Sequence, residues 1–158
     1  MTYFTKEEEG KRVVDWEKLK KVTRQAVRFM DDVIEVNPYT LEQIRKMTMA
    51  VRRIGLGVGG WADMLIDLNI PYDSQEALDL AEKVMKTVEE TAVQESENLA
   101  KERGAFPLWS QSIYRKNKPR RNSTVTTIAP TGTISIIAGA SSGIEPLYAI
   151  AYRHIFKD

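Results

Sequence analysis

Two segments with the composition of β-strands lie far apart in a chain whose other patterned segments predict helices. Residues 123–129 are β-branched at five of seven positions and end before Pro130, which is typical of a strand. Residues 54–59 alternate glycine with branched side chains and predict a short buried strand or an extended passage. Since a sheet of two strands is marginal by itself, these strands belong either to a small sheet in a mainly helical domain or to a larger sheet completed by another chain.

Four segments repeat apolar residues at intervals of three and four, the spacing of helices that bury one face. The predicted helices follow Asp15, begin at Thr40 with Gln43 completing a capping box, span about residues 61–69, and run from Ser74 to Gly104. Residues 1–12 are polar, and we expect a flexible lead-in there. We expect residues 1–158 to form a single unit of the α/β class, mainly helical in isolation, with about four main helices and two short strands.

The sequence contains no cysteine and a single histidine, His154. This composition excludes disulfides, thiolate nucleophiles, iron–sulfur clusters, zinc–thiolate sites and any metal site that needs several imidazoles from one chain. Because His154 stands beside Arg153 near one end, we expect it at a surface or interface rather than acting as a base. The sequence therefore predicts no metal site, and it restricts catalysis by the chain's own side chains to carboxylate, Lys, Ser, Thr or Tyr chemistry.

Charge and hydropathy limit the partners of the chain. Lys and Arg number 23 against 22 Asp and Glu, so the net charge of +1 creates no overall field that attracts nucleic acid or an anionic membrane. No apolar run approaches the roughly 20 residues of a membrane span, and residues 1–12 lack the apolar core of a signal peptide. We expect a cytoplasmic protein with no nucleic-acid or membrane partner. The basic cluster 115–121 favours a solvated loop over a phosphate contact.

A motif rich in hydroxyls directly follows the strand predicted at 123–129. It consists of Pro130, Thr131, Gly132, Thr133, Ile134 and Ser135. Because residues 136–140 can begin a helix, hydroxyls and backbone N–H groups converge where the helix dipole favours an anion. The motif has no Lys as in a P-loop, so it does not indicate a metal-bridged triphosphate. Composition alone leaves two interpretations open, an anion site and a helix cap without a ligand.

The glycines at 55–60 satisfy the pattern G-x-G-x-x-G of dinucleotide sites, but their context does not. The preceding residues have a helical pattern, and the acid expected about 20 residues further on falls near a helix start at Asp73 rather than at a strand end. The glycines therefore favour close packing of backbones over a nicotinamide site. Glu145 is the one acid in the Gly- and Ser-rich segment 139–146, and we expect its carboxylate to accept hydrogen bonds from nearby amides.

Five motifs occur in a characteristic order. They are RIGLGVGGWADML at 53–65, IPYDS at 70–74, ERGAF at 102–106, RNSTVTTIAPTGTIS at 121–135 and GASSGIEP at 139–146. Taken together they resemble the large catalytic subunit of ribonucleotide reductase, most closely the adenosylcobalamin-dependent class. The resemblance covers the chain from about Val13 to Arg153, and several long motifs in the same order exclude coincidence.

The resemblance implies a late portion of a ten-stranded α/β barrel, with 54–59 and 123–129 as barrel strands whose partners are encoded elsewhere. It implies that residues 130–135 bind the phosphates of a ribonucleotide substrate, in agreement with the helix-terminus argument. It also implies adenosylcobalamin as cofactor of the assembled enzyme. We expect the chain to bind an upstream reductase chain or to associate with itself.

The chain departs from the family pattern in its cysteines. The Asn-x-Cys-x-Glu finger loop, the redox pair and the C-terminal shuttle cysteines have no counterpart, and Ala140 stands where relatives can carry a cysteine. Since a thiyl radical needs a thiol, we expect no catalytic residue here and no activity of the isolated chain. Two hypotheses remain: a segment that supplies the phosphate loop to a reductase complex, and a non-catalytic remnant that binds a nucleotide or a protein.

Overall fold

The computed structural model describes residues 1–147 and 149, and it is mainly helical. Its elements in chain order are η1 (Thr2–Phe4), β1 (Thr5–Glu8), β2 (Lys11–Val14), α1 (Trp16–Val36), α2 (Glu42–Val51), α3 (Trp61–Asp67), α4 (Gln75–Arg103), η2 (Trp109–Gln111) and α5 (Gly132–Ala138). All four predicted helices are present, and α5 begins at Gly132, before the residues 136–140 where the sequence allowed a further helix to begin. No helix in this part of the chain is long and apolar enough to cross a membrane.

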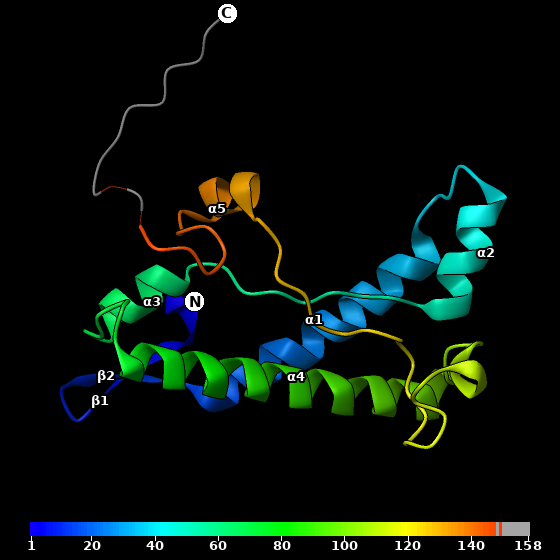
Figure 1. The fold of residues 1–158 in the computed structure, drawn as a ribbon, viewed down its shortest axis with the longest axis horizontal. Coiled ribbons are helices and arrows are strands. Elements are labelled where there is room, and N and C mark those ends of the chain that lie inside the picture. Colours follow the sequence, from blue (N-terminus) through cyan, green and yellow to red (C-terminus); the bar gives the residue numbers. More distant parts are fainter. Residues whose placement is uncertain (148, 150–158) are drawn as a thin grey trace, which may run out of the picture.

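Helices α1 and α4 run side by side and form the base of the molecule (Figure 1). Both begin where the sequence predicts, because a side chain satisfies an N–H group that the first turn leaves free. The Asp15 carboxylate accepts a hydrogen bond from Lys18 N at 3.0 Å, and Ser74 Oγ accepts one from Ala77 N at 3.2 Å. Helix α4 ends at Gly104, whose positive φ of 85° suits a residue without a side chain.

The interface between α1 and α4 contains the core. Two clusters of buried apolar side chains follow one another along it, the first including α3 and the second including the extended segments described below. Their α1 and α4 members are Leu19, Val27, Ile34, Ala77, Val84, Val88, Ala92 and Leu99. Burying one such Val or Leu side chain stabilises a fold by about 1.5–3 kcal/mol, so this stripe holds the two helices together.

The two predicted strands lie side by side above these helices, but they form extended segments rather than regular strands (Figure 1). Leu56 and Thr126 make a single parallel bridge, in which Leu56 N donates to Val125 O at 2.8 Å and Thr127 N donates to Leu56 O at 3.1 Å. The prediction of a regular strand at 123–129 is therefore wrong. Among the described residues no other backbone extends this bridge into a ladder, and a ladder needs partners along its length.

The two regular strands are β1 and β2, an antiparallel hairpin that pairs Thr5 with Val14. This hairpin lies partly within residues 1–12, where the sequence suggested a flexible lead-in. Glu9 and Gly10 form its turn with φ values of 51° and 77°, the positive angles typical of tight hairpins. Arg12 Nη2 contacts Asp67 Oδ2 at 2.8 Å, which connects the hairpin to α3.

Helix α2 begins later than predicted, at Glu42, with Leu41 as its N-cap and no side-chain cap. The expected capping box of Thr40 and Gln43 is therefore wrong. In a capping box the side chain of the third helical residue bonds the backbone N–H of the N-cap, but Gln43 is only the second residue of α2. The apolar side chains of Leu41, Ile44 and Met47 remain more than half exposed on this helix.

Candidate functional site

The 130–135 motif forms the beginning of α5. The helix starts at Gly132, inside the motif and earlier than the expected position 136. Thr131 precedes it with φ 54° and ψ 21°, in the left-handed region. A β-branched residue rarely adopts this conformation, because its side chain crowds the backbone there. Such a conformation persists only where surrounding contacts hold it, and it is common at ligand-binding sites.

The contacts that hold Thr131 come from the Gly- and Ser-rich segment 139–146. Gly143 N donates to Thr131 Oγ1 at 2.6 Å. One turn into α5, Ser135 Oγ donates to Gly132 O at 2.8 Å and lies 3.0 Å from Ser142 Oγ. The fold therefore brings the PTGTIS and SSGIEP motifs together, with the second supporting the first.

The open donors of the loop are its backbone amides and one hydroxyl. The N–H groups of Gly132, Thr133 and Ile134 have no carbonyl one turn before them, and no side chain of the described residues caps α5. Thr133 is exposed, whereas Ser135 is 7% exposed and its hydroxyl is engaged inside the protein. Of the three hydroxyls expected to converge, only that of Thr133 therefore faces solvent without an internal partner in the described structure.

A cavity of about 530 Å³ lies beside this loop. Its lining includes Thr131, Ile134 and Ser135 of the loop, residues 57–59 of the first extended segment, and residues 1–3. No charged side chain of the described residues lines this cavity, but Met1 does line it, and its terminal ammonium group donates to Gly59 O at 2.7 Å. An anion there would be held by neutral donors of the loop, by the positive end of the α5 dipole and by the charge of this ammonium group. Diphosphate groups of a nucleotide are anions of suitable size for such a cavity.

Gly55 and Gly57 allow the two extended segments to approach each other closely. A Cβ atom on Gly55 would lie 2.9 Å from Thr127 Cγ2, and one on Gly57 would lie 3.0 Å from Thr127 O. The amides at the start of α3 are already used, since Gly60 N donates to Ser141 O at 2.8 Å and Trp61 N donates to Gly143 O at 3.3 Å. The donors that a dinucleotide would need are therefore occupied, which supports the packing interpretation.

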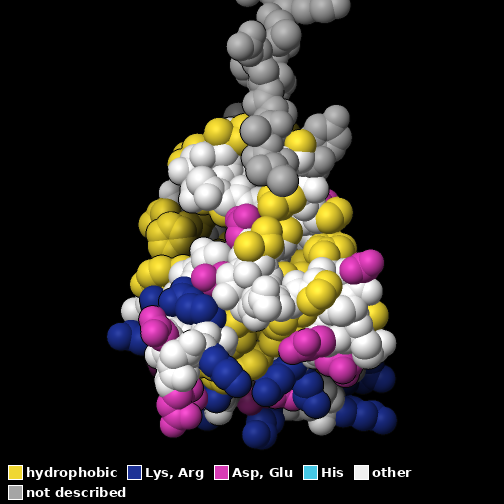
Figure 2. Space-filling view, turned by 90° about the vertical axis from the view of Figure 1, so that its left-hand side faces the viewer, with side chains coloured by type: hydrophobic (Ala, Val, Ile, Leu, Met, Phe, Trp, Pro, Cys, Tyr) yellow, Lys and Arg dark blue, Asp and Glu magenta, His cyan; other side chains and the backbone are white. Residues whose placement is uncertain are grey.

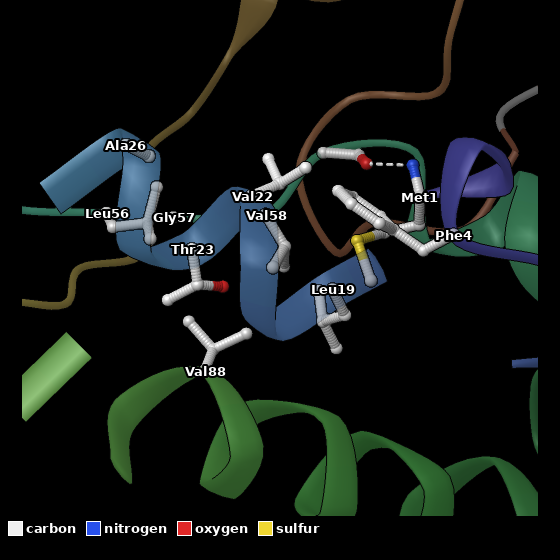
Figure 3. A pocket seen from close by; sticks show the side chains of 11 residues that line it. Met1, Phe4, Leu19, Val22, Thr23, Ala26, Leu56, Gly57, Val58 and Val88 are labelled. Atoms are coloured by element: carbon white, nitrogen blue, oxygen red, sulfur yellow. Dashed lines mark hydrogen bonds between the residues drawn. The ribbon is translucent and has the colours of Figure 1, made fainter. Parts of the chain in front are cut away.

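A second, smaller cavity of about 120 Å³ lies under the same segment (Figure 3). Side chains of η1, of α1 and of Val88 on α4 surround it, and nearly all of them are apolar. Its apolar lining, with Thr23 as the only polar side chain, provides no set of groups that could hold an anion. This smaller cavity is therefore not a candidate anion site, whereas the cavity beside α5 adjoins the uncapped start of that helix.

The basic cluster at 115–121 divides into two parts. Arg115, Lys116 and Lys118 are exposed, as expected of a solvated loop. Arg120 is buried against the Tyr114 ring at 3.4 Å, and Arg121 enters the ion-pair network described below. The cluster therefore presents no continuous basic face.

Two other predicted features contribute no site. Glu145 is exposed, and within the described residues its backbone N–H, not its carboxylate, makes a hydrogen bond, to Ser142 O at 3.2 Å. His154 lies outside the described residues. The described residues contain no group of three His, Cys, Asp or Glu that could hold a metal ion.

A buried charge network lies where the second extended segment begins, and the sequence analysis did not identify it. Asp31 on α1 is completely buried, and its Oδ1 accepts hydrogen bonds from Arg52 Nη2 at 2.8 Å and Asn122 Nδ2 at 3.0 Å. Its Oδ2 lies 3.2 Å from Arg103 Nη1 and 3.4 Å from Arg121 Nε. The sequence does contain a signal for this buried carboxylate, because Asp31 lies four residues after Val27 and so falls on the helix face that the apolar residues occupy.

Opposing effects act on the Asp31 carboxyl. Burial raises its pKa, but hydrogen bonds from Arg52 and Asn122 and the charges of Arg52 and Arg121 outweigh burial, so the pKa lies below its ordinary value. The network joins α1, the end of α2, α4 and residues 121–122. It therefore fixes the start of the extended segment that leads to the phosphate loop.

Comparisons with known proteins agree with this arrangement. The family model "Ribonucleotide reductase, barrel domain" matches residues 1–120 and 115–157. The vitamin B12-dependent ribonucleoside-diphosphate reductase of Thermoplasma acidophilum is 53% identical over 151 residues, covering 94% of this chain and 20% of that protein. The enzyme of the same name from Mycobacterium tuberculosis strain H37Rv is 50% identical over 150 residues, covering 91% of this chain and 21% of that protein.

A more distant relative is the ribonucleoside-diphosphate reductase subunit alpha of Chlamydia pneumoniae, 32% identical over 181 residues, which cover 90% of this chain and 17% of that protein. The chain thus spans about a fifth of the length of the relatives it matches. The parallel pairing of its two extended segments and their covering by α1 and α4 agree with part of a barrel. The chain belongs to the barrel-domain family of ribonucleotide reductases.

Proposed function

We propose that this chain is a late segment of the catalytic barrel of an adenosylcobalamin-dependent ribonucleotide reductase, and that residues 130–135 bind the phosphates of the ribonucleotide substrate. The observation that carries the proposal is the uncapped start of α5, which lies beside a cavity of about 530 Å³ that Thr131, Ile134 and Ser135 line. The names of the relatives supply the reaction class, reduction of a ribonucleoside diphosphate.

The residues of the loop would bind and orient the substrate rather than react with it. Amide N–H groups of Gly132, Thr133 and Ile134 and the Thr133 hydroxyl would donate to phosphate oxygens. Each hydrogen bond to a charged group is worth about 1.5–3 kcal/mol. Because the phosphate is remote from the reacting sugar carbon, this binding energy serves to hold the sugar in place.

The chemistry of the cofactor belongs to another part of the enzyme. Adenosylcobalamin, when bound, supplies radical chemistry, and the relatives' names indicate this cofactor. The chain contains no cysteine that could receive a radical, and its one histidine is not among the described residues. The residues present therefore do not fit the radical centre, and the thiol must come from residues beyond this sequence. The cytoplasmic location remains a prediction.

Co-expression with a candidate upstream chain tests the proposal. That chain should carry the Asn-x-Cys-x-Glu loop, and the purified pair should form deoxyribonucleotides when adenosylcobalamin and a dithiol are supplied. Either chain alone should be inactive. A co-purifying pair that shows no reductase activity, or activity of this chain by itself, would contradict the proposal.

A further inference from the structure

Asp63 lies on the first turn of α3 and contacts a loop that is distant in sequence. Asp63 Oδ2 accepts a hydrogen bond from Ser141 N at 2.6 Å. The backbone N–H of Asp63 donates to Ser141 Oγ at 3.4 Å. An acid in the first turn of a helix commonly stabilises the amides of that same turn. Here the Asp63 carboxylate instead holds a backbone amide 78 residues away.

The loop that Asp63 holds is the one that supports Thr131. Ser141 O accepts from Gly60 N, and Gly143 O accepts from Trp61 N, so three groups of α3 position residues 141–143. Gly143 is buried, and its N–H is the donor to Thr131 Oγ1 at 2.6 Å. The hydrogen bonds of Ser141 N and Gly143 N, and the backbone between these two residues, thus link Asp63 to Thr131, the N-cap of α5.

The conformation of Gly143 makes this connection specific. Its φ is 45°, and a Cβ atom there would lie 3.3 Å from Ala129 O and 2.6 Å from Glu145 Oε2. The segment therefore has little freedom to move while Gly143 N remains directed at Thr131. Loss of the Asp63 acceptor would leave Ser141 N without this partner, and the bonds from Gly60 N and Trp61 N would remain to hold residues 141–143.

We propose that Asp63 is a positioning residue for the phosphate-binding loop, acting through Ser141 and Gly143 to hold Thr131 in its left-handed conformation. This inference rests on the proposed function of residues 130–135. Asp63 need not touch the substrate, because its effect is on the direction of the α5 amides. Its loss should therefore weaken phosphate binding while leaving the helical core intact.

The test uses the full chain labelled with ¹⁵N and inorganic pyrophosphate as the probe. Asp63→Ala removes the acceptor, and Asp63→Asn keeps an oxygen that can accept from Ser141 N. Asp67→Ala is the matched control, because Asp67 lies on the same helix but contacts Arg12 and Thr5 of the hairpin. Dissociation constants come from the shifts of the Gly132 and Thr133 amides, and amide exchange is followed at Gly143.

We expect Asp63→Ala to weaken pyrophosphate binding about 10-fold, equivalent to about 1.4 kcal/mol, and to accelerate exchange of the Gly143 amide. Asp63→Asn should stay close to the native affinity, and Asp67→Ala should leave both readouts unchanged. Native affinity in Asp63→Ala, or equal losses in the Asp63→Ala and Asp67→Ala variants, would overturn the proposal.

Two further results separate this inference from the proposed function. If the native chain shows no pyrophosphate shifts at residues 130–135, the proposed function fails, and Gly143 exchange in the Asp63 variants still decides the coupling. Faster exchange in Asp63→Ala alone then supports the positioning role, and unchanged exchange overturns it. If Asp63→Ala does not fold, Asp63→Ser replaces it, because its hydroxyl is too short to reach Ser141 N.

Discussion

Asp31 shows how a single buried carboxylate organises distant parts of this chain. It is completely buried beside Arg52, which is 3% exposed, so each charge depends on the other for compensation. Arg52 reaches this position with a φ of 45°, which ends α2 and turns the guanidinium back toward α1. Removing one partner of such a pair costs far more than the pair contributes, because the remaining charge stays buried without a partner.

Asp31→Asn should destabilise the fold by about 3–5 kcal/mol at pH 7, because Arg52 loses its buried counter-charge. The pKa of Asp31 is lowered in the folded state, so the unfolded chain, with a pKa of about 3.9, binds the proton first as pH falls. The stabilisation is therefore complete above about pH 5 and is lost as pH falls below about 4. In urea unfolding measured from pH 7 to pH 3, the free energies of unfolding of the native chain and the variant should converge as the pH falls.

The control for this variant is Glu17→Gln, which removes an exposed carboxylate paired only with Lys20 on the surface. Such a pair contributes about 0–1 kcal/mol, so this variant should unfold almost like the native chain. A constant difference between Asp31→Asn and the native chain across the pH range would contradict the assignment of the titrating group.

Thr133 and Ser135 should have different effects on phosphate binding, although the sequence placed their hydroxyls together. Thr133→Ala removes an exposed donor and should weaken pyrophosphate binding by about 3- to 10-fold. This loss corresponds to part of the free energy that one hydrogen bond to a charged phosphate contributes. Ser135→Ala removes the bond to Gly132 O, so it should accelerate amide exchange in α5. Titration and exchange measurements on both variants separate the two effects. Identical profiles would show that the hydroxyls act alike.

At the scale of elements, the pairing of the two extended segments depends on glycines. A Cβ atom on Gly57 would lie 3.0 Å from Thr127 O, so a side chain there would require the second segment to shift. The neighbouring Gly59 has no atom within 4 Å of the position that a Cβ would take, and its φ is not positive. Two glycines of the same motif therefore have different requirements.

Gly57→Ala should separate the segments and destabilise the fold by about 1–3 kcal/mol, the usual cost of forcing extra atoms into packed structure. Gly59→Ala should be neutral or stabilise by about 0.4–1 kcal/mol, since it reduces the freedom of the unfolded chain. Thermal unfolding of the two variants compares them directly. Equal stabilities would show that the Leu56–Thr126 bridge tolerates a wider spacing.

For the molecule as a whole, apolar side chains gather toward the end where α5 lies and charged ones toward α4 and the hairpin (Figure 2). Ile136 and Ile137 on α5 are 73% and 81% exposed, and Ile128 on the adjoining segment is 67% exposed. Ile54 and Val125 are instead buried against the helices, so only one face of the extended segments is uncovered. Exposed apolar surface of this kind marks an interaction site.

The isolated chain should therefore associate with itself or with an upstream chain through this uncovered face. Sedimentation of the native chain should show species larger than a monomer, and the double variant Ile136→Lys, Ile137→Lys should shift it toward the monomer. Phe29→Lys on α1, also an exposed apolar position at 69%, is the control. A native chain that stays monomeric at high concentration, with little binding of a hydrophobic dye, would refute this expectation.

The sequence by itself determined the local elements and the family. Helix starts at Asp15 and Ser74 were predictable because capping and apolar periodicity involve residues a few positions apart. The interpretation of the glycines at 55–60 as packing residues holds for Gly55 and Gly57, whereas no atom lies within 4 Å of a Cβ position on Gly59. Ordered motifs led to the ribonucleotide reductase family, which the comparisons confirm.

Only the tertiary structure decided which distant residues meet. The bond from Ser141 to Asp63 spans 78 positions, and the bond from Asn122 to Asp31 spans 91, and neither leaves a periodic pattern in the sequence. The same holds for the hydroxyl of Ser135, which turns inward because Gly132 O and Ser142 Oγ lie beside it. Local patterns determine backbone conformation, whereas the partner of a buried polar group depends on how those elements pack.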